Sequence, residues 1–196
     1  MAKLKTTLGV TAGIFDETGR KVLLRRRKEH DSITSLDYFG CWELPIVAVQ
    51  EATEKTIPYD YLCRELIRGV KAETGFVISL IPMPAFFALP FKNDKGEYDL
   101  LLITTLSFRE VVRQEETQNE LRFVDVNELN ELALEYSPAK KGEKGELLRE
   151  GKGLLSGFGR RQHVAALKVM ERLCPSEDQG IARKTLFRIQ ADWKPI

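Results

Sequence analysis

The side chains whose types could do chemistry are concentrated between positions 60 and 75. The acidic residues there are Asp60, Glu65 and Glu73, and two arginines, Arg64 and Arg68, lie among them. Carboxylates hold hard cations such as Mg²⁺ when several oxygens lie close together, and guanidinium groups pair with phosphates or carboxylates. Glu65 and Glu73 are eight residues apart, about 12 Å along a helix axis, so they cannot easily share one ion.

The apolar residues of the same segment predict the helix that positions these groups. They recur at spacings of three and four residues, as the buried side of an amphipathic helix does. These positions are Leu62, Leu66, Ile67 and Val70. Gly75 follows, where a helix commonly ends. We therefore expect one helix over residues 60–74, with Leu62, Leu66 and Val70 facing a sheet.

Alternating apolar residues before this helix predict strands. Residues 7–14 alternate with a period of two, which is typical of a half-buried strand. The turn-forming residues 16–19 and the apolar residues 22–24 predict a hairpin whose second strand leads into Arg25, Arg26 and Arg27. Residues 42–49 form another extended apolar stretch, and Pro45 restricts it to an edge or a bulge.

The rest of the chain is expected to contain further strands and helices. Strands are predicted at 77–81, 85–91, 100–108 and 121–126, with a turn at 93–96 and a short helix capped by Asn127. A second long helix is predicted over 156–173, and alternation at Thr185, Phe187 and Ile189 predicts a final strand. Residues 137–153 are rich in glycine, lysine and glutamate, which is typical of a mobile surface loop.

Length and charge exclude several classes of protein. The chain has 196 residues, with 30 Lys and Arg against 29 Asp and Glu and a formal net charge of +1. We expect a single domain over 1–196 with a C-terminal extension at about 175–196, and nucleic acid is not an expected partner. The longest nearly apolar run, 77–91, contains three prolines and is too short to span a bilayer. Three separated cysteines without a CxxC pair fit a cytoplasmic protein.

The order of these elements and three groups of residues resemble a known family. They are Trp42-Glu43-Leu44-Pro45, then Arg64-Glu65-Leu66 with Ala72-Glu73-Thr74-Gly75-Phe76, and finally the run from Leu121 to Leu129. Over roughly residues 6–173 the sequence resembles the Nudix hydrolase superfamily. The box of that family reads Gly, five residues, Glu, seven residues, Arg-Glu-aliphatic, any residue, Glu-Glu, any residue, Gly-aliphatic.

The resemblance implies both a fold and a reaction. The fold is α/β (α+β), the Nudix fold, with a mixed β-sheet packed between helices. The reaction is attack of water on a diphosphate, assisted by divalent cations held by carboxylates on one helix face.

The box is degenerate in this sequence. Counted back from its closing glycine, Arg68 and Glu73 are retained. Gly69 and Ala72 stand where two glutamates belong, and Asp60 replaces the upstream glutamate. Substituting glutamate at positions 69 and 72 is therefore expected to restore, with Glu73, a row of carboxylates on one helix face.

A second register of the box is also open. In it Arg64-Glu65-Leu66 is the conserved triplet, and four extra residues separate it from the closing motif. Ala72 is a departure in either register. The Gly-Gly that usually follows Leu-Pro in the family is Ile46-Val47 here, so the tight turn beside the box is altered.

The resemblance implies roles for individual residues, each with a structural alternative. The implied catalytic carboxylates are Glu73, Asp60 and Glu120, the metal ligands are Glu73 and Glu65, and the ligand-binding residues are Arg25, Arg26, Arg27, Trp42, Arg64 and Arg68. The alternatives are a helix cap for Asp60, an exposed loop for Glu120, a core position for Trp42 and solvated ends of elements for the arginines.

Two functions follow from the degenerate Nudix box. The first is a Nudix-fold protein that binds a nucleotide or nucleoside-diphosphate derivative with little or no hydrolysis. The alternative is a divergent Mg-dependent Nudix hydrolase that cleaves a nucleoside diphosphate linked to another moiety. Binding of Mg²⁺, or of Mn²⁺, is expected to be weak or absent. The family is often dimeric, which makes a homodimer one expected assembly.

Overall fold

The structure, a computed structural model, describes ten segments of the chain. They are residues 7–26, 36–37, 42–49, 57–80, 85–92, 98–107, 111–117, 119–134, 139–140 and 159–191. The strands are β1 (Thr7–Phe15), β2 (Val22–Arg26), β3 (Leu36–Asp37), β4 (Trp42–Glu43), β5 (Ile46–Val49), β6 (Phe76–Ile78), β7 (Phe87–Lys92), β8 (Tyr98–Ser107), β9 (Val111–Gln114), β10 (Leu121–Val124) and β11 (Ala139–Lys140). The helices are α1 (Tyr59–Thr74), α2 (Val126–Leu134), α3 (Gly159–Leu173) and α4 (Ser176–Ala191).

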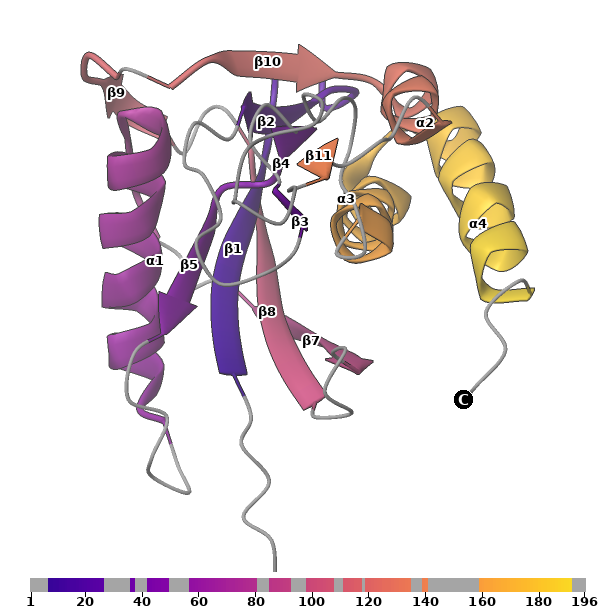
Figure 1. The fold of residues 1–196 in the computed structure, drawn as a ribbon. Coiled ribbons are helices and arrows are strands. Elements are labelled where there is room, and N and C mark those ends of the chain that lie inside the picture. Colours follow the sequence, from indigo (N-terminus) through magenta and orange to yellow (C-terminus); the bar gives the residue numbers. More distant parts are fainter. Residues whose placement is uncertain are drawn as a thin grey trace, which may run out of the picture.

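The main sheet is mixed and is built around β1. β8 pairs with β1 in parallel along its whole length, and β2 and β5 pair with β1 antiparallel. The sheet has the order β10-β2-β1-β8-β7, with β4 paired to β2 and β5 paired to β1. Figure 1 shows α1 on one side of this sheet and the α3–α4 pair on the other. The predicted mixed sheet packed between helices is confirmed.

The alternation of side chains along β1 supplies two separate cores. Leu8, Val10, Ala12 and Ile14 belong to one buried cluster with Leu62, Leu66 and Val70 of α1. On the other face, a Cβ added at Gly13 would lie 2.9 Å from the Cγ2 of Val169 on α3, and closer still to its Cγ1. The glycine therefore lets α3 approach the strand, while the apolar positions two residues apart pack against α1.

The predicted face of α1 is confirmed, since Leu62, Leu66 and Val70 are buried. Leu66→Ala should lower the free energy of unfolding by about 2–5 kcal/mol, because its side chain is fully buried and the truncation leaves a cavity. Arg64→Ala, at an exposed position of the same helix, is the control and should change stability by less than about 0.5 kcal/mol. Urea denaturation measures both. A loss below about 1 kcal/mol at Leu66 would contradict the assigned face.

The final strand predicted over 185–189 is wrong, because these residues lie in the helix α4. Three alternating residues are too few to distinguish a strand from a helix. The decisive spacing is four residues: Ala182 and Leu186 are buried against the α3 side of the molecule, while Phe187 is 73% exposed. α4 thus presents one buried stripe, as a helix that covers a core does.

The predicted cap of the short helix α2 is also wrong. Asp125, not Asn127, accepts hydrogen bonds at its N-terminus, through Oδ1 from the backbone N–H groups of Asn127 (2.9 Å) and Glu128 (3.0 Å). α2 begins two residues earlier than a cap at Asn127 implies, at Val126. Aspartate and asparagine cap equally well, so residue type alone could not choose between them.

Most other predicted elements agree with the structure or lie outside its described residues. Two predicted strands are too long: the one over 121–126 ends at Val124, since Val126 begins α2, and the one over 77–81 ends at Ile78. The strand at 7–14, the hairpin and the long helix ending at Leu173 are confirmed, and Gly19 in the hairpin turn has a φ of 69°. The turn at 93–96 lies outside the described residues. So does the loop at 137–153, except for β11, which pairs with β3. In the part of the chain that the structure describes, no helix has the length and apolar character needed to cross a bilayer.

The turn between α3 and α4 is tied to the β1–β2 hairpin. Arg20 pairs with the buried Asp178 of α4 through two hydrogen bonds, Nε–Oδ2 at 2.9 Å and Nη2–Oδ1 at 3.2 Å. The Cys174 thiol donates to the carbonyl oxygen of Arg20 at 3.8 Å. Burial, with the nearby carboxylates of Asp178 and Asp16, raises the pKa of Cys174 to about 12.

Cys174 should therefore resist alkylation in the folded protein, because thiolate is the reactive form and is nearly absent at pH 8. Iodoacetamide labelling followed by peptide mass spectrometry should modify Cys174 only when urea unfolds the chain, with the half-buried Cys63 as an internal comparison. The unfolded pKa is about 8.5, so this thiol's contribution to stability is present below that pH and is lost as pH rises toward 12. Labelling of both cysteines at equal rates in native buffer would contradict the burial.

Candidate functional site

The C-terminal end of α1 is held in place by the segment that precedes β10. Gly75 ends the helix with a φ of 71°, and its N–H donates to the carbonyl of Lys71 at 2.8 Å. A Cβ at this position would lie 3.2 Å from the carbonyl carbon of Glu115 and closer to its oxygen, so glycine is required by both conformation and space. The Nδ2 of Asn119 donates to the carbonyl of Glu73 at 2.7 Å. These contacts fix the last turn of α1, which carries Glu73.

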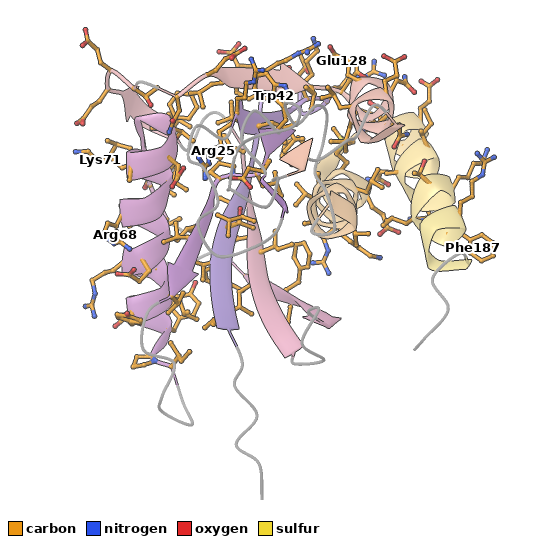
Figure 2. The ribbon with its side chains drawn as sticks, in the orientation of Figure 1. Arg25, Trp42, Arg68, Lys71, Glu128 and Phe187 are labelled. Atoms are coloured by element: carbon orange, nitrogen blue, oxygen red, sulfur yellow. The ribbon has the colours of Figure 1, made fainter. Side chains whose placement is uncertain are left out.

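The Glu73 side chain meets an arginine from the sheet. Arg25 Nε lies 2.6 Å from Glu73 Oε2, and Arg25 Nη2 lies 2.6 Å from Glu43 Oε1. The period of β2 explains why this arginine is used: Leu23, two residues earlier, packs in the core cluster of α1, so Arg25 points to the same face. β4 supplies Glu43 because Arg25 and Glu43 are directly paired in the β2–β4 ladder. Arg25 is labelled beside the end of α1 in Figure 2.

The Glu43–Arg25–Glu73 triad is largely removed from water. Its side chains are 8%, 7% and 24% exposed respectively, so Glu73 is the member nearest to solvent. Ion pairs in such surroundings are screened less than surface pairs. One guanidinium between two carboxylates leaves the triad with a formal charge of −1.

Two exposed ion pairs involve near neighbours of the triad in sequence, and by the alternation of β2 Arg26 lies on the face opposite to Arg25. Arg26 Nη1 lies 3.2 Å from Glu120 Oε2, with the two side chains 42% and 52% exposed, and Lys71 Nζ lies 3.0 Å from Glu115 Oε2. Exposed pairs of this kind hold their partners weakly and are screened by salt. The buried triad and these exposed pairs, which can exchange partners, are therefore separate features of neighbouring positions in the chain.

The structure brings together one part of the predicted set of residues. Arg25 and Glu73 meet in the triad, Arg26 pairs with Glu120, and Trp42 is buried in the core cluster of α3, directly opposite Arg26 in the β2–β4 ladder. Whether these residues bind a ligand stays a prediction.

The other predicted residues lie apart from the triad or outside the residues that the structure describes. Glu65 accepts from Arg68 one helical turn away, with Nη2 and Oε2 2.7 Å apart, and this bond raises the pKa of Arg68. Arg64 and Asp60 are exposed on α1, and Asp60 lies in its first turn without acting as its N-cap, a position that Pro58 holds. Arg27 lies outside the described residues.

Glu43 and Asn119 are the residues that sequence reasoning missed. Glu43 was visible in the Trp42-Glu43-Leu44-Pro45 motif, but a role follows only once the strand ladder places it opposite Arg25. One signal could have found it: a charged residue inside an apolar extended stretch requires a buried partner of opposite charge. No pattern in the sequence pointed to Asn119.

The glycine that replaces a box glutamate has a packing reason. Gly69 is buried on the side of α1 that faces β5, and a Cβ built there would overlap the Cγ2 of Val47 and lie 2.7 Å from its Cβ. Val47 is itself buried and stands where the family usually has glycine. The expectation that glutamate at 69 would restore a carboxylate row is therefore wrong for this chain, because Val47 occupies the space.

The residues present do not fit a divalent cation bound as the intact box implies. Position 69 is closed by Val47, Ala72 carries no ligand atom, Glu65 is paired with Arg68, and Glu73 is paired with Arg25. Among the described residues, no group of three or more His, Cys, Asp or Glu side chains is arranged to hold a metal ion.

Solved Nudix proteins are among the structures similar to this chain. A MutT protein from Methanosarcina mazei is 20% identical over 66% of this chain and 83% of its own, with a TM-score of 0.46. The NUDIX domain of Shewanella oneidensis NrtR, complexed with ADP ribose, is 16% identical over 65% and 77%, with a TM-score of 0.44. The NrtR structure with a 27mer DNA is 15% identical over 84% of this chain and 62% of its own, with a TM-score of 0.47. No family model matches the sequence, and none of the curated proteins matches it significantly.

The close contact at Gly69 predicts that replacing this glycine by alanine destabilises the protein. Replacement of a glycine within a helix by alanine normally raises the free energy of unfolding by about 1 kcal/mol. Gly180→Ala in α4, where no atom lies within 4 Å of the new Cβ, should show this gain. Gly69→Ala should instead lower the free energy of unfolding by about 1–3 kcal/mol, because its Cβ collides with Val47.

A double-mutant cycle separates this collision from other effects. Val47→Ala removes both Cγ atoms and should recover part of the loss in the Gly69→Ala background, with a coupling energy of about 1 kcal/mol or more by urea denaturation. Independent effects of the two substitutions, or equal gains from Gly69→Ala and Gly180→Ala, would count against the contact.

Proposed function

We propose that this protein is a Nudix-like binding module for a nucleotide or nucleoside-diphosphate derivative and does not hydrolyse it by the metal-dependent route. The observation that carries the proposal is the Val47–Gly69 contact, in which an aliphatic side chain fills the place of a box glutamate. The ligand class is supported by the sequence resemblance and by the arginines beside the triad.

The loss of hydrolysis follows from what metal-assisted attack on a diphosphate needs. Several carboxylate oxygens must meet at one divalent cation, which orients the diphosphate and activates water. Here the helix offers Glu73 at that end, and Glu73 is already paired with Arg25 at 2.6 Å. A second carboxylate cannot be placed at position 69 while Val47 is present. The carboxylate cluster is thus replaced by an aliphatic contact and an internal ion pair.

Anion binding is assigned to the exposed Arg26 rather than to the buried triad. Arg26 is 42% exposed and pairs with Glu120 through a weak surface ion pair, so an incoming phosphate can take the place of the carboxylate on its guanidinium. Arg25 is engaged by two carboxylates on the opposite face of β2 and connects this strand to β4 and α1. We therefore assign the direct phosphate contact to Arg26 and a positioning role to Arg25.

Thermal unfolding in the presence of EDTA tests the binding. A panel of nucleoside diphosphates, free or linked to a second group, should include members that raise the melting temperature without metal, since a ligand that binds only the folded state stabilises it by mass action. Arg26→Ala should reduce this shift. Glu120→Gln, which removes the competing carboxylate but keeps its size, should preserve or increase it. A panel that gives no shift with or without Mg²⁺ would contradict the proposed ligand class.

A hydrolysis assay with Mg²⁺ or Mn²⁺ on the same panel tests the second half of the proposal. Product release should not exceed the protein-free blank. Metal-dependent turnover that Glu73→Gln abolishes would instead support the divergent hydrolase, with Glu73 and Glu120 as its first candidate carboxylates. Ligand binding and turnover are measured separately, so either half of the proposal can fail alone.

A further inference from the structure

We infer that the guanidinium of Arg25 is a permanent internal cation, which occupies between Glu43 and Glu73 the place that a divalent ion would take if the arginine were absent. The site therefore does not fit the metal of the family's box because an arginine side chain takes the place of the metal ion. This inference concerns the ligand-free protein and stands on the geometry of the triad.

The geometry brings two carboxylates to a single planar group. Glu43 Oε1 and Glu73 Oε2 each lie 2.6 Å from a nitrogen of the same guanidinium, Nη2 and Nε respectively. The two nitrogens share one carbon, so the carboxylates converge on adjacent corners of one small cation. The carboxylates come from β4 and α1, which are placed by the strand ladder and by the fixed end of the helix, respectively. Their convergence is therefore built into the fold.

Charge and burial explain why some cation must be present. Two carboxylates brought together away from water cannot both stay ionised without a positive group between them. Carboxylate oxygens are the ligands preferred by Mg²⁺, Mn²⁺ and Ca²⁺, and removal of a long side chain would leave room for such an ion with water. Arginine keeps its charge throughout the accessible pH range and is covalently attached. A chelator can remove a metal ion, whereas it cannot remove this cation.

The internal cation also bears on the metal dependence of ligand binding, and this consequence rests on the proposed function. If the protein binds a phosphorylated ligand, the binding should be as strong in EDTA as in Mg²⁺, because the assigned phosphate contact, Arg26, and the cation of the triad, Arg25, are both side chains that a chelator cannot remove. The position of the cation itself does not depend on any ligand.

The experiment uses Mn²⁺ as a probe of the full-length, ligand-free protein, by electron paramagnetic resonance and calorimetric titration. The wild-type protein should bind Mn²⁺ no better than an exposed-arginine control, Arg26→Ala. Arg25→Ala should bind it at least tenfold more tightly, because Glu43 and Glu73 are then left to share a metal ion. Arg25→Lys, which restores a cation, should behave like wild type. Arg25→Ala/Glu73→Gln, which removes one of the two ligands, should lose the gain.

The stability of Arg25→Ala gives a second readout. Loss of the shared guanidinium should make this variant less stable in EDTA, and millimolar Mn²⁺ should raise its melting temperature by several degrees more than that of wild type or Arg26→Ala. If the variant is unfolded in EDTA, Mn²⁺ should refold it. Tight Mn²⁺ binding by the wild type, no gain in a folded Arg25→Ala variant, or an unfolded variant that Mn²⁺ does not rescue would each overturn the inference. None of these assays contains a nucleotide, so their failure is distinct from failure of the proposed function.

Discussion

The contact between α1 and β5 at Gly69 determines which residue α1 can carry at position 69. Val47 fills the space that any side chain at position 69 would need, so the helix and the strand keep their separation only while position 69 is glycine. The same helix keeps its buried stripe of Leu62, Leu66 and Val70 against β1. Position 69, where one register of the box expects a glutamate, is therefore part of the hydrophobic packing of α1.

The buried ionic triad lies at the end of the same helix. Glu73, at the edge of the core, is paired with a cation that β2 provides through the alternation that places Arg25 on the α1 face. A buried ion pair is weak evidence for stability, because desolvation offsets much of the attraction. Its consequence here is positional: one guanidinium connects β2, β4 and α1. The exposed pairs near it in sequence are weak, so the buried triad and the exposed pairs have different physical origins.

The parts of this arrangement that depend on local periodicity could be read from the sequence. β1, the hairpin and α1 follow from periods of two and 3.6, and Gly75 marks the end of the helix because only glycine suits both its φ and its contact with Glu115. The contacts that make the site could not be predicted from the sequence. Val47 meets Gly69, and Arg25 meets Glu43, only once the strands have paired in register and packed against α1. The prediction for α4 was wrong for another reason. Three alternating residues indicated a strand, whereas the four-residue spacing of the buried Ala182 and Leu186 is that of a helix.

The C-terminal helices also bear on the site, through the strand that carries its arginines. At the turn before β2, Arg20 is bound by the buried Asp178 of α4. Within β2, Val22 and Leu24 belong to the same buried cluster as Ala182 and Leu186, whereas Leu23 packs toward α1. One face of β2 is thus anchored by the C-terminal helices and the other by the box helix. Because a shift of one residue along this strand would exchange its two faces, both sets of contacts together hold Arg25 opposite Glu43 and Glu73.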